Sequence, residues 1–147
     1  MNRNRTITLP TPEDYEELLQ LWEASVRSTH HFLTEADIRF YQELVPQYFP
    51  AVALHIIRNR QGKITAFMGL SDETIEMLFV HPEEQGTGLG KQLICFATQE
   101  KGIRKVDVNE QNTDALHFYH HMGFQVIGRD ETDSSGKAFP ILHMQLK

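Results

Sequence analysis

The sequence predicts one mixed α/β domain, in which a sheet of about seven strands is flanked by about four helices. Segments with helical spacing of apolar residues alternate with short β-rich runs along the chain. Two hairpin turns indicate antiparallel neighbours, and one strand–helix–strand unit over residues 74–108 indicates a parallel pair joined by a right-handed crossover. The 147 residues can bury a sizeable core and contain no linker, so we expect a single domain over residues 1–147.

The chain opens with a strand and a helix. Thr6–Leu9 alternates as a strand does, and a helix start follows, because Thr11 can cap and Pro12 fits the first helical position. The helix should run to about Ser28, since its apolar residues share one face: Tyr15, Leu18, Leu19, Trp22 and Val26.

A second helix is predicted after a loop over residues 28–33. Thr34 can cap this helix, with Asp37 at its third position. Proline lacks the N–H that a helix interior needs, so we expect Pro46 to make the late part of this helix irregular.

Three strands should follow as an antiparallel meander. The runs Val52–Arg58 and Ile64–Ser71 are joined by the hairpin signal Asn59–Lys63. A second turn at residues 71–73 leads into the strand Thr74–Val80, which Pro82 ends.

A glycine-rich loop and a helix come next. In Gln85–Lys91, three glycines on alternate positions allow a tight bend that turns backbone N–H groups towards a ligand. The helix from about Gly88 to Lys101 ends at Gly102. The bare N–H groups and the dipole of a helix start attract phosphates, although a tight turn without a ligand would have the same glycines. Neither the dinucleotide fingerprint nor the nucleoside-triphosphate loop fits the spacing.

The last third of the chain should complete the sheet. Val106–Val108 reads as a short strand, and Thr113 with Asp114 can cap a helix that Gly123 ends. Two strands, Phe124–Asp130 and Ile141–Leu146, then form a hairpin around the turn at residues 133–136.

The pattern Q-x-x-G-x-G from Gln85 to Gly90, after an apolar strand ending in V-x-P, resembles the pyrophosphate loop of the GCN5-related N-acetyltransferases, the GNAT superfamily. The pattern N-x-x-A-x-x-F-Y-x-x-x-G-F from Asn112 to Phe124 resembles the second signature of that family. The two signatures stand in the family's order. H-x-F-L from His30, taken with V-N-E-Q-N at residues 108–112, resembles small bacterial members of unassigned substrate.

The resemblance implies the GNAT fold, with the fourth and fifth strands parallel and splayed, and it implies acetyl-CoA as cosubstrate. The pyrophosphate would bind the loop residues Gln85, Gly86, Thr87, Gly88, Leu89, Gly90 and Lys91. The pantetheine would enter between the splayed strands and bond the backbone of Leu78, Phe79 and Val80, with one N–H at Leu78 or Phe79 polarising the thioester carbonyl. Asn109 would sit beside the site and Asn112 would contact the cofactor, but a turn residue and a helix cap explain these two asparagines equally well.

Tyr119 is the candidate general acid. A phenol with a pKa near ~10 stays protonated at neutral pH and can donate to a departing thiolate of pKa ~8.5. The resemblance assigns the same role to Tyr119 and also places it beside the cofactor, whereas its apolar neighbours would equally suit a plain core residue.

Two residues are candidates for the base. An alkyl amine of pKa ~10.4 arrives protonated, so a group must take its proton before attack. Glu76, the one charged residue of its strand, is expected on the face that carries Leu78, lining the acceptor site. His30 lies in the loop that walls the acceptor pocket in this family and could act with a pKa near ~6.5, or could be an ordinary surface histidine.

Other groups are weaker candidates. His117, His120 and His121 have helical spacing but lack the HExxH pattern, so we expect no metal. Cys95 is the one cysteine, which excludes an internal disulfide, and it reads as a small apolar residue.

The resulting hypothesis is a cytoplasmic N-acetyltransferase that acts on a primary amine by direct attack, either on a small molecule or on a protein. A sensor that binds acetyl-CoA without turnover is the alternative. The start of the chain lacks an apolar signal core, and no segment is apolar enough to span a membrane. The net charge of −6 argues against nucleic acid as a partner. Monomer and homodimer remain equally open.

Overall fold

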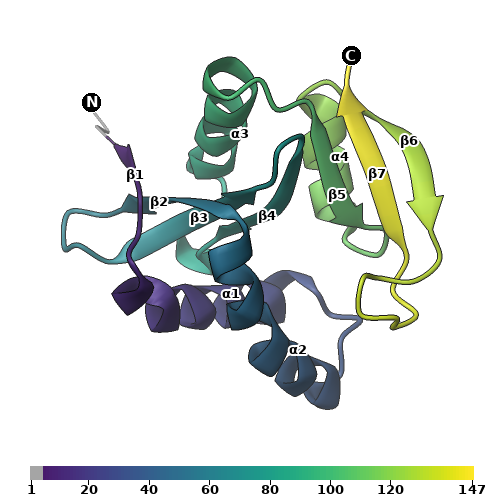
Figure 1. Cartoon of the computed structure of the whole chain (residues 1–147), viewed down its shortest axis with the longest axis horizontal. Helices are drawn as coiled ribbons and strands as arrows, with labels where there is room; N and C mark the ends of the chain where they lie inside the picture. Colours follow the sequence, from purple (N-terminus) through teal and green to yellow (C-terminus); the bar gives the residue numbers. More distant parts are fainter. Residues whose placement is uncertain (1–4) are drawn as a thin grey trace.

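A computed structural model describes residues 5–147, which form a seven-stranded sheet in the order β1-β2-β3-β4-β5-β7-β6 with helices on both faces (Figure 1). The strands are β1 (Ile7–Thr8), β2 (Ala53–Arg58), β3 (Ile64–Leu70), β4 (Thr74–Val80), β5 (Lys105–Asn109), β6 (Phe124–Asp130) and β7 (Ile141–Leu146). The helices are α1 (Tyr15–Thr29), α2 (Glu35–Tyr48), α3 (Leu89–Glu100) and α4 (Thr113–His121). No helix within residues 5–147 is long and apolar enough to cross a membrane.

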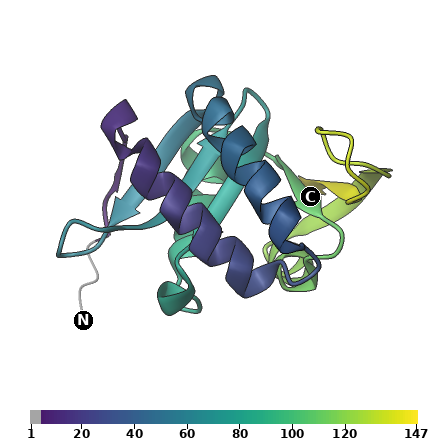
Figure 2. The ribbon, with the colours of Figure 1, turned by 90° about the horizontal axis from the view of Figure 1, so that it is seen from below.

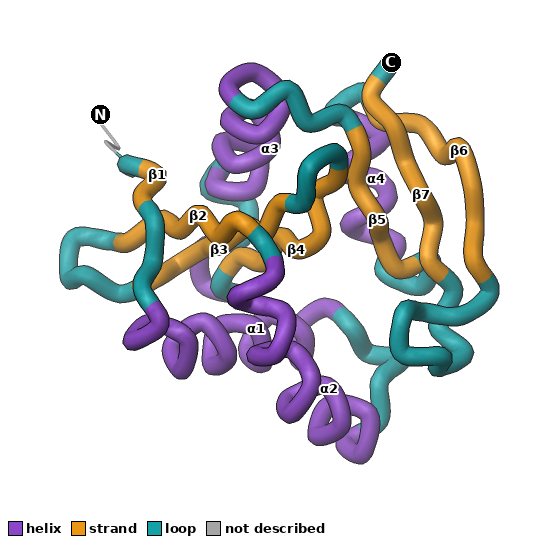
Figure 3. The backbone as a smooth tube through the Cα atoms, in the orientation of Figure 1, coloured by secondary structure: helices purple, strands orange, loops and turns teal. Residues whose placement is uncertain are grey.

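The predicted strand pairing is confirmed. Neighbouring strands run antiparallel except β4 and β5, which are parallel partners among the described strands. Their pairing covers only Thr74 with Lys105 and Ile75 with Val106. Beyond these pairs the strands separate, and Figure 3 shows β5, β7 and β6 running steeply across the view while β2, β3 and β4 lie nearly level.

The sheet separates two hydrophobic clusters. On one face, α1 and α2 pack over β2–β4 through residues such as Leu18, Trp22 and Phe67, as the view in Figure 2 shows. On the other face, α3 and α4 pack through residues such as Leu93 and Tyr119. Because both faces of the central strands are covered, all seven residues of β3 are buried.

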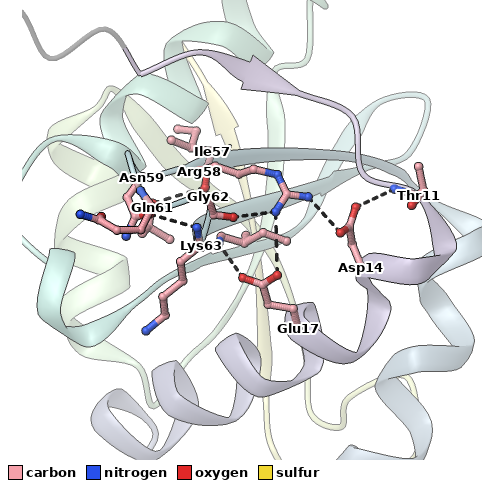
Figure 4. A network of polar contacts seen from close by, with 11 residues as sticks. Thr11, Asp14, Glu17, Ile57, Arg58, Asn59, Gln61, Gly62 and Lys63 are labelled. Atoms are coloured by element: carbon pink, nitrogen blue, oxygen red, sulfur yellow. Dashed lines mark hydrogen bonds and ion pairs between the residues drawn. The ribbon is translucent and has the colours of Figure 1, made fainter.

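Polar contacts tie the start of α1 to the β2–β3 hairpin (Figure 4). The guanidinium of Arg58 donates to Asp14 Oδ1 at 2.9 Å and to the Gly62 carbonyl at 2.8 Å. Glu17 accepts from the backbone N–H of Ile64 at 2.7 Å. These contacts fix the hairpin turn against the helix, and no residue of the turn lines the cavity described below.

One detail of helix α2 differs from the sequence-based prediction, and another confirms it. Helix α2 continues through Pro46 to Tyr48, so the predicted irregularity comes only at the 3-10 turn Phe49–Ala51. Pro46 lies in the last turn of the helix, where its missing N–H costs a single hydrogen bond. Thr34 and Asp37 form the expected capping box.

Candidate functional site

A cavity of about 470 Å³ opens where β4 and β5 separate. Its walls come from the ends of these two strands, the loop after β4, the first turns of α3 and α4, and the end of α1. Every residue predicted for the site lines this cavity except Thr87. Segments far apart in the sequence therefore meet at one opening in the sheet.

The loop after β4 presents backbone N–H groups at one end of the cavity. Gly88 has φ +92° and directly precedes α3, and the same left-handed conformation occurs at Gly86. The first hydrogen bond of the helix runs from the Gln92 N–H to the Gly88 carbonyl. The N–H groups of Leu89, Gly90 and Lys91 therefore have no partner within the helix. These donors and the helix dipole together make a site for an anion.

Thr87 makes hydrogen bonds that hold the loop in place. Its hydroxyl donates to the Glu84 carbonyl at 2.6 Å, and its own carbonyl accepts from the Arg5 guanidinium at 2.7 Å. The side chain of Thr87 is therefore used within the loop, outside the cavity lining, and its predicted contact with the pyrophosphate stays a prediction. Its place in the loop braces the neighbouring glycines.

Glu76 lies at a β-bulge. Leu70 pairs with Ile75 and Gly69 with Met77, so Glu76 is the extra residue of β4. The bulge breaks the simple alternation that predicted Glu76 on the face of Leu78, because a bulge turns the following side chains to the opposite faces. Glu76 is exposed, lines the cavity, and accepts a hydrogen bond from the Ser71 hydroxyl at 2.8 Å.

Tyr119 is buried in α4 but reaches the cavity lining. Its ring packs between those of Phe118 and Phe124, at centroid distances of 5.3 and 5.8 Å. Burial raises the pKa of the Tyr119 phenol above its ordinary value. The phenol is therefore protonated throughout the neutral range, as a proton donor must be.

Both asparagines of the second motif have local structural roles. Asn109 Oδ1 accepts from the Gln111 N–H at 2.9 Å, and Asn112 Oδ1 accepts from the Ala115 N–H at 3.3 Å as the cap of α4. The predicted cap at Thr113 and Asp114 was wrong by one position, because the amide oxygen of Asn112 already meets the helix N–H. Both residues also line the cavity, where the Asn112 amide nitrogen remains able to donate.

His30 caps the C-terminal end of α1 and lines the cavity. Its Nδ1 lies 2.7 Å from the Thr29 hydroxyl, and its ring packs against Phe32 at 5.3 Å. Burial, with a smaller effect of the neighbouring His31, lowers the pKa of His30 to about 4. His30 is therefore neutral at neutral pH and has a pKa below the value near ~6.5 that the prediction used, while its role as a base stays a prediction.

The low pKa of His30 predicts a pH effect on stability. Between about pH 6.5 and pH 4 the unfolded chain binds a proton that the folded His30 does not, so the free energy of unfolding falls as pH falls through this range. At pH 4.5 we expect His30→Gln to keep about 2 to 3 kcal/mol that the wild type loses relative to pH 7. Urea denaturation at both pH values measures this, with the exposed His120→Gln as control. Parallel losses in the wild type and His30→Gln would contradict it.

Sequence reasoning missed Asp107. It lines the same cavity from β5, one position beyond the Ile75–Val106 pair and thus at the level of Glu76. The available signal in the sequence was a single carboxylate between two valines. Only the tertiary structure, in which β4 and β5 separate at this point, shows that Asp107 and Glu76 line the same opening. Among residues 5–147, no group of three or more histidine, cysteine or acidic side chains is placed to hold a metal.

Comparisons with known proteins agree with this geometry. The sequence model of the acetyltransferase (GNAT) domain matches residues 51–126. The peptidyl-lysine N-acetyltransferase YjaB of Salmonella typhimurium is 39% identical over 132 residues, which are 90% of this chain and 91% of that protein. The Escherichia coli protein of the same name is 36% identical, over 90% of each chain. The solution structure of apo YjaB from Escherichia coli covers 96% of both chains, with a TM-score of 0.88 and 34% identity.

Proposed function

Because this chain belongs to the GNAT family of acetyl-CoA-dependent N-acetyltransferases, we propose that it transfers the acetyl group to the side-chain amine of lysine in proteins. One observation carries the proposal: the cavity between β4 and β5 has a loop with free backbone N–H groups at one end, and two of the four acidic residues in its lining, Glu76 and Asp107, stand level with each other where the strands part. A cationic acceptor such as lysine suits these acids. The relatives named for peptidyl-lysine support the same acceptor.

The cofactor would bind along β4. Its pyrophosphate would meet the N–H groups of the loop and of the first turn of α3. Since pairing with β5 ends at Ile75, the edge of β4 over Leu78–Val80 is free to bond the pantetheine amides as a neighbouring strand would. One N–H, at Leu78 or Phe79, would then polarise the thioester carbonyl. The amide of Asn112, which lines the cavity, would assist, and Asn109 would hold the turn beside it.

The chemical step is direct attack. The neutral amine nitrogen bonds to the thioester carbon, the carbon–sulfur bond breaks, and the Tyr119 O–H gives its proton to the leaving thiolate. The proton that the nitrogen loses as it becomes an amide then returns through water to the Tyr119 phenolate, which restores the phenol. The raised pKa of Tyr119 would make this transfer uphill against a solvated thiolate of pKa ~8.5. Inside the cavity, however, the thiolate would also be desolvated. Desolvation raises the pKa of the thiol and brings it closer to the pKa of Tyr119.

Glu76 is the proposed proton acceptor for the incoming ammonium, directly or through water. His30 is the weaker candidate, because its burial disfavours the protonated, charged form that it would have to adopt, whereas Glu76 is exposed. We expect Glu76→Gln to lower kcat/KM for a lysine peptide about tenfold at pH 7, below the usual ~10²-fold of a sole base, because Asp107 and water remain. Steady-state kinetics measures this, with the exposed Glu73→Gln as control. An unchanged rate would remove Glu76 from the role.

The proposed function is tested in two steps. Calorimetric titration with acetyl-CoA establishes cofactor binding. Thiol release is then measured with a blocked pentapeptide, Gly-Gly-Lys-Gly-Gly, and with the same peptide carrying norleucine for lysine and a free α-amine. Release with the first peptide alone supports lysine as the acceptor. Release only with the second would move the acceptor to α-amines, and binding without any release would favour a sensor.

A further inference from the structure

A row of three ionisable side chains crosses the strands β5, β7 and β6. His143 on β7 stands directly opposite Asp107 on β5, and its Nδ1 lies 2.6 Å from Asp107 Oδ1. Its Nε2 lies 2.8 Å from Asp130 Oδ2 on β6. The neighbouring residues of β5 and β7 (Val106, Val108, Leu142 and Met144) are buried on the other face of the sheet. The row therefore lies on the face that continues into the cavity, which Asp107 lines.

Both ring nitrogens of His143 meet a carboxylate, so the ring is built to carry a proton on each of them. Asp107 and Asp130 accordingly raise the pKa of His143 above its ordinary value. The nearest cation on β6, Arg129, is bound to Glu110 at 2.7 Å and does not compete for these acids. With His143 protonated, the two carboxylates still leave the row with a net negative charge.

Resting on the proposed lysine acceptor, we propose that Asp107 holds the ammonium group of the incoming lysine, and that His143 and Asp130 are positioning residues that aim it. His143 occupies one oxygen of Asp107 and fixes the plane of the carboxylate, which leaves the other oxygen to accept from the substrate. Asp130 keeps His143 protonated and oriented while preserving the negative charge that attracts the ammonium.

Glu76 and Asp107, two of the four acidic residues that line the cavity, would have different roles because their hydrogen-bond partners differ. A carboxylate that accepts from a ring fixed by a second acid is held in one orientation, whereas one that accepts from a rotatable hydroxyl is free to turn towards a substrate. Asp107 has the first kind of partner and Glu76, bonded to Ser71, has the second. Asp107 thus suits holding the ammonium, whereas Glu76 suits taking its proton.

The test compares the Kd of two blocked pentapeptides in the presence of coenzyme A. One has a central lysine, and the other has norleucine in its place. The wild type should bind the lysine peptide at least about tenfold more tightly, the lower end for a charge-assisted hydrogen bond. We expect Asp107→Asn to remove this preference and to leave the Kd of acetyl-CoA within twofold. Glu110→Gln, which breaks the nearby ion pair with Arg129 outside the cavity, should change neither.

The positioning role is tested by His143→Ala, His143→Asn and Asp130→Asn. His143→Ala should cut the lysine preference severalfold, and His143→Asn should restore most of it, because its amide can still donate to Asp107. In Asp130→Asn, His143 loses one carboxylate and its pKa falls, so the KM for the lysine peptide should change between pH 6 and 8, where the wild type is flatter. A loss of stability alone would change neither the lysine preference nor the pH dependence of KM, so these measurements test the positioning role.

Asp107→Asn with an unchanged lysine preference would overturn the inference and leave the proposed acceptor standing. His143 variants that lose acetyl-CoA affinity and lysine preference together would reduce His143 to a structural residue and also overturn it. A wild type that binds acetyl-CoA but neither prefers nor acetylates the lysine peptide would instead refute the proposed function itself.

Discussion

Gly88→Glu is expected to abolish acetyl-CoA binding, weakening the Kd by at least about 100-fold. Gly88 has φ +92°, a conformation that costs an L-residue roughly 1–2 kcal/mol. Nothing lies within 4 Å of an added Cβ, so the new side chain has room to project from the loop. Its carboxylate would then stand where the pyrophosphate binds and would occupy the free N–H groups of α3. Calorimetric titration measures the loss.

Two further variants separate the causes of this loss. Gly62→Glu places the same residue at φ +82° in the β2–β3 hairpin (Figure 4), outside the cavity lining and with nothing within 4 Å of the new Cβ. It should lower Tm much as Gly88→Glu does while leaving the Kd unchanged. Gly88→Ala carries the strain without the charge and should weaken binding less. Wild-type affinity in Gly88→Glu would mean that the pyrophosphate binds elsewhere.

Tyr119→Phe is expected to lower kcat by about 10²-fold or more, within the range for loss of a positioned general acid. The change removes the phenol proton but keeps the ring that packs between Phe118 and Phe124, so folding and the Kd of acetyl-CoA should change little. A loss confined to kcat indicates an interaction made only in the transition state. Thiol-release kinetics with the lysine peptide, alongside calorimetry, measures both quantities.

Tyr15→Phe is the matched control for this substitution. Tyr15 packs its ring against Phe49 at 5.2 Å on the opposite face of the sheet, and removal of its hydroxyl should leave kcat within twofold. A Tyr119→Phe enzyme with the wild-type rate would show that water protonates the thiolate. Equal losses in both variants would point to a general effect on the fold.

Local signals in the sequence were enough for the architecture. The cap at Thr34, the hairpin at Asn59–Lys63 and the helical spacing of the apolar residues in α1 each depend on near neighbours in the chain. The loop Gln85–Lys91 is predicted to bind a phosphate for the same reason, because a strand, three glycines and a helix start follow one another directly. Tyr119 and the two asparagines were identified through a motif that is also contiguous.

The tertiary structure alone decided the electrostatics of the site. The pKa of His30 depends on what buries it, and the face of Glu76 depends on a bulge against β3, so neither could be derived from its neighbours in the chain. Asp107, Asp130 and His143 come from three different strands, and only the order β5-β7-β6 brings them into contact. A sequence determines local geometry through short-range sterics and hydrogen bonds, whereas charge interactions act through space and depend on which distant residues the fold makes neighbours.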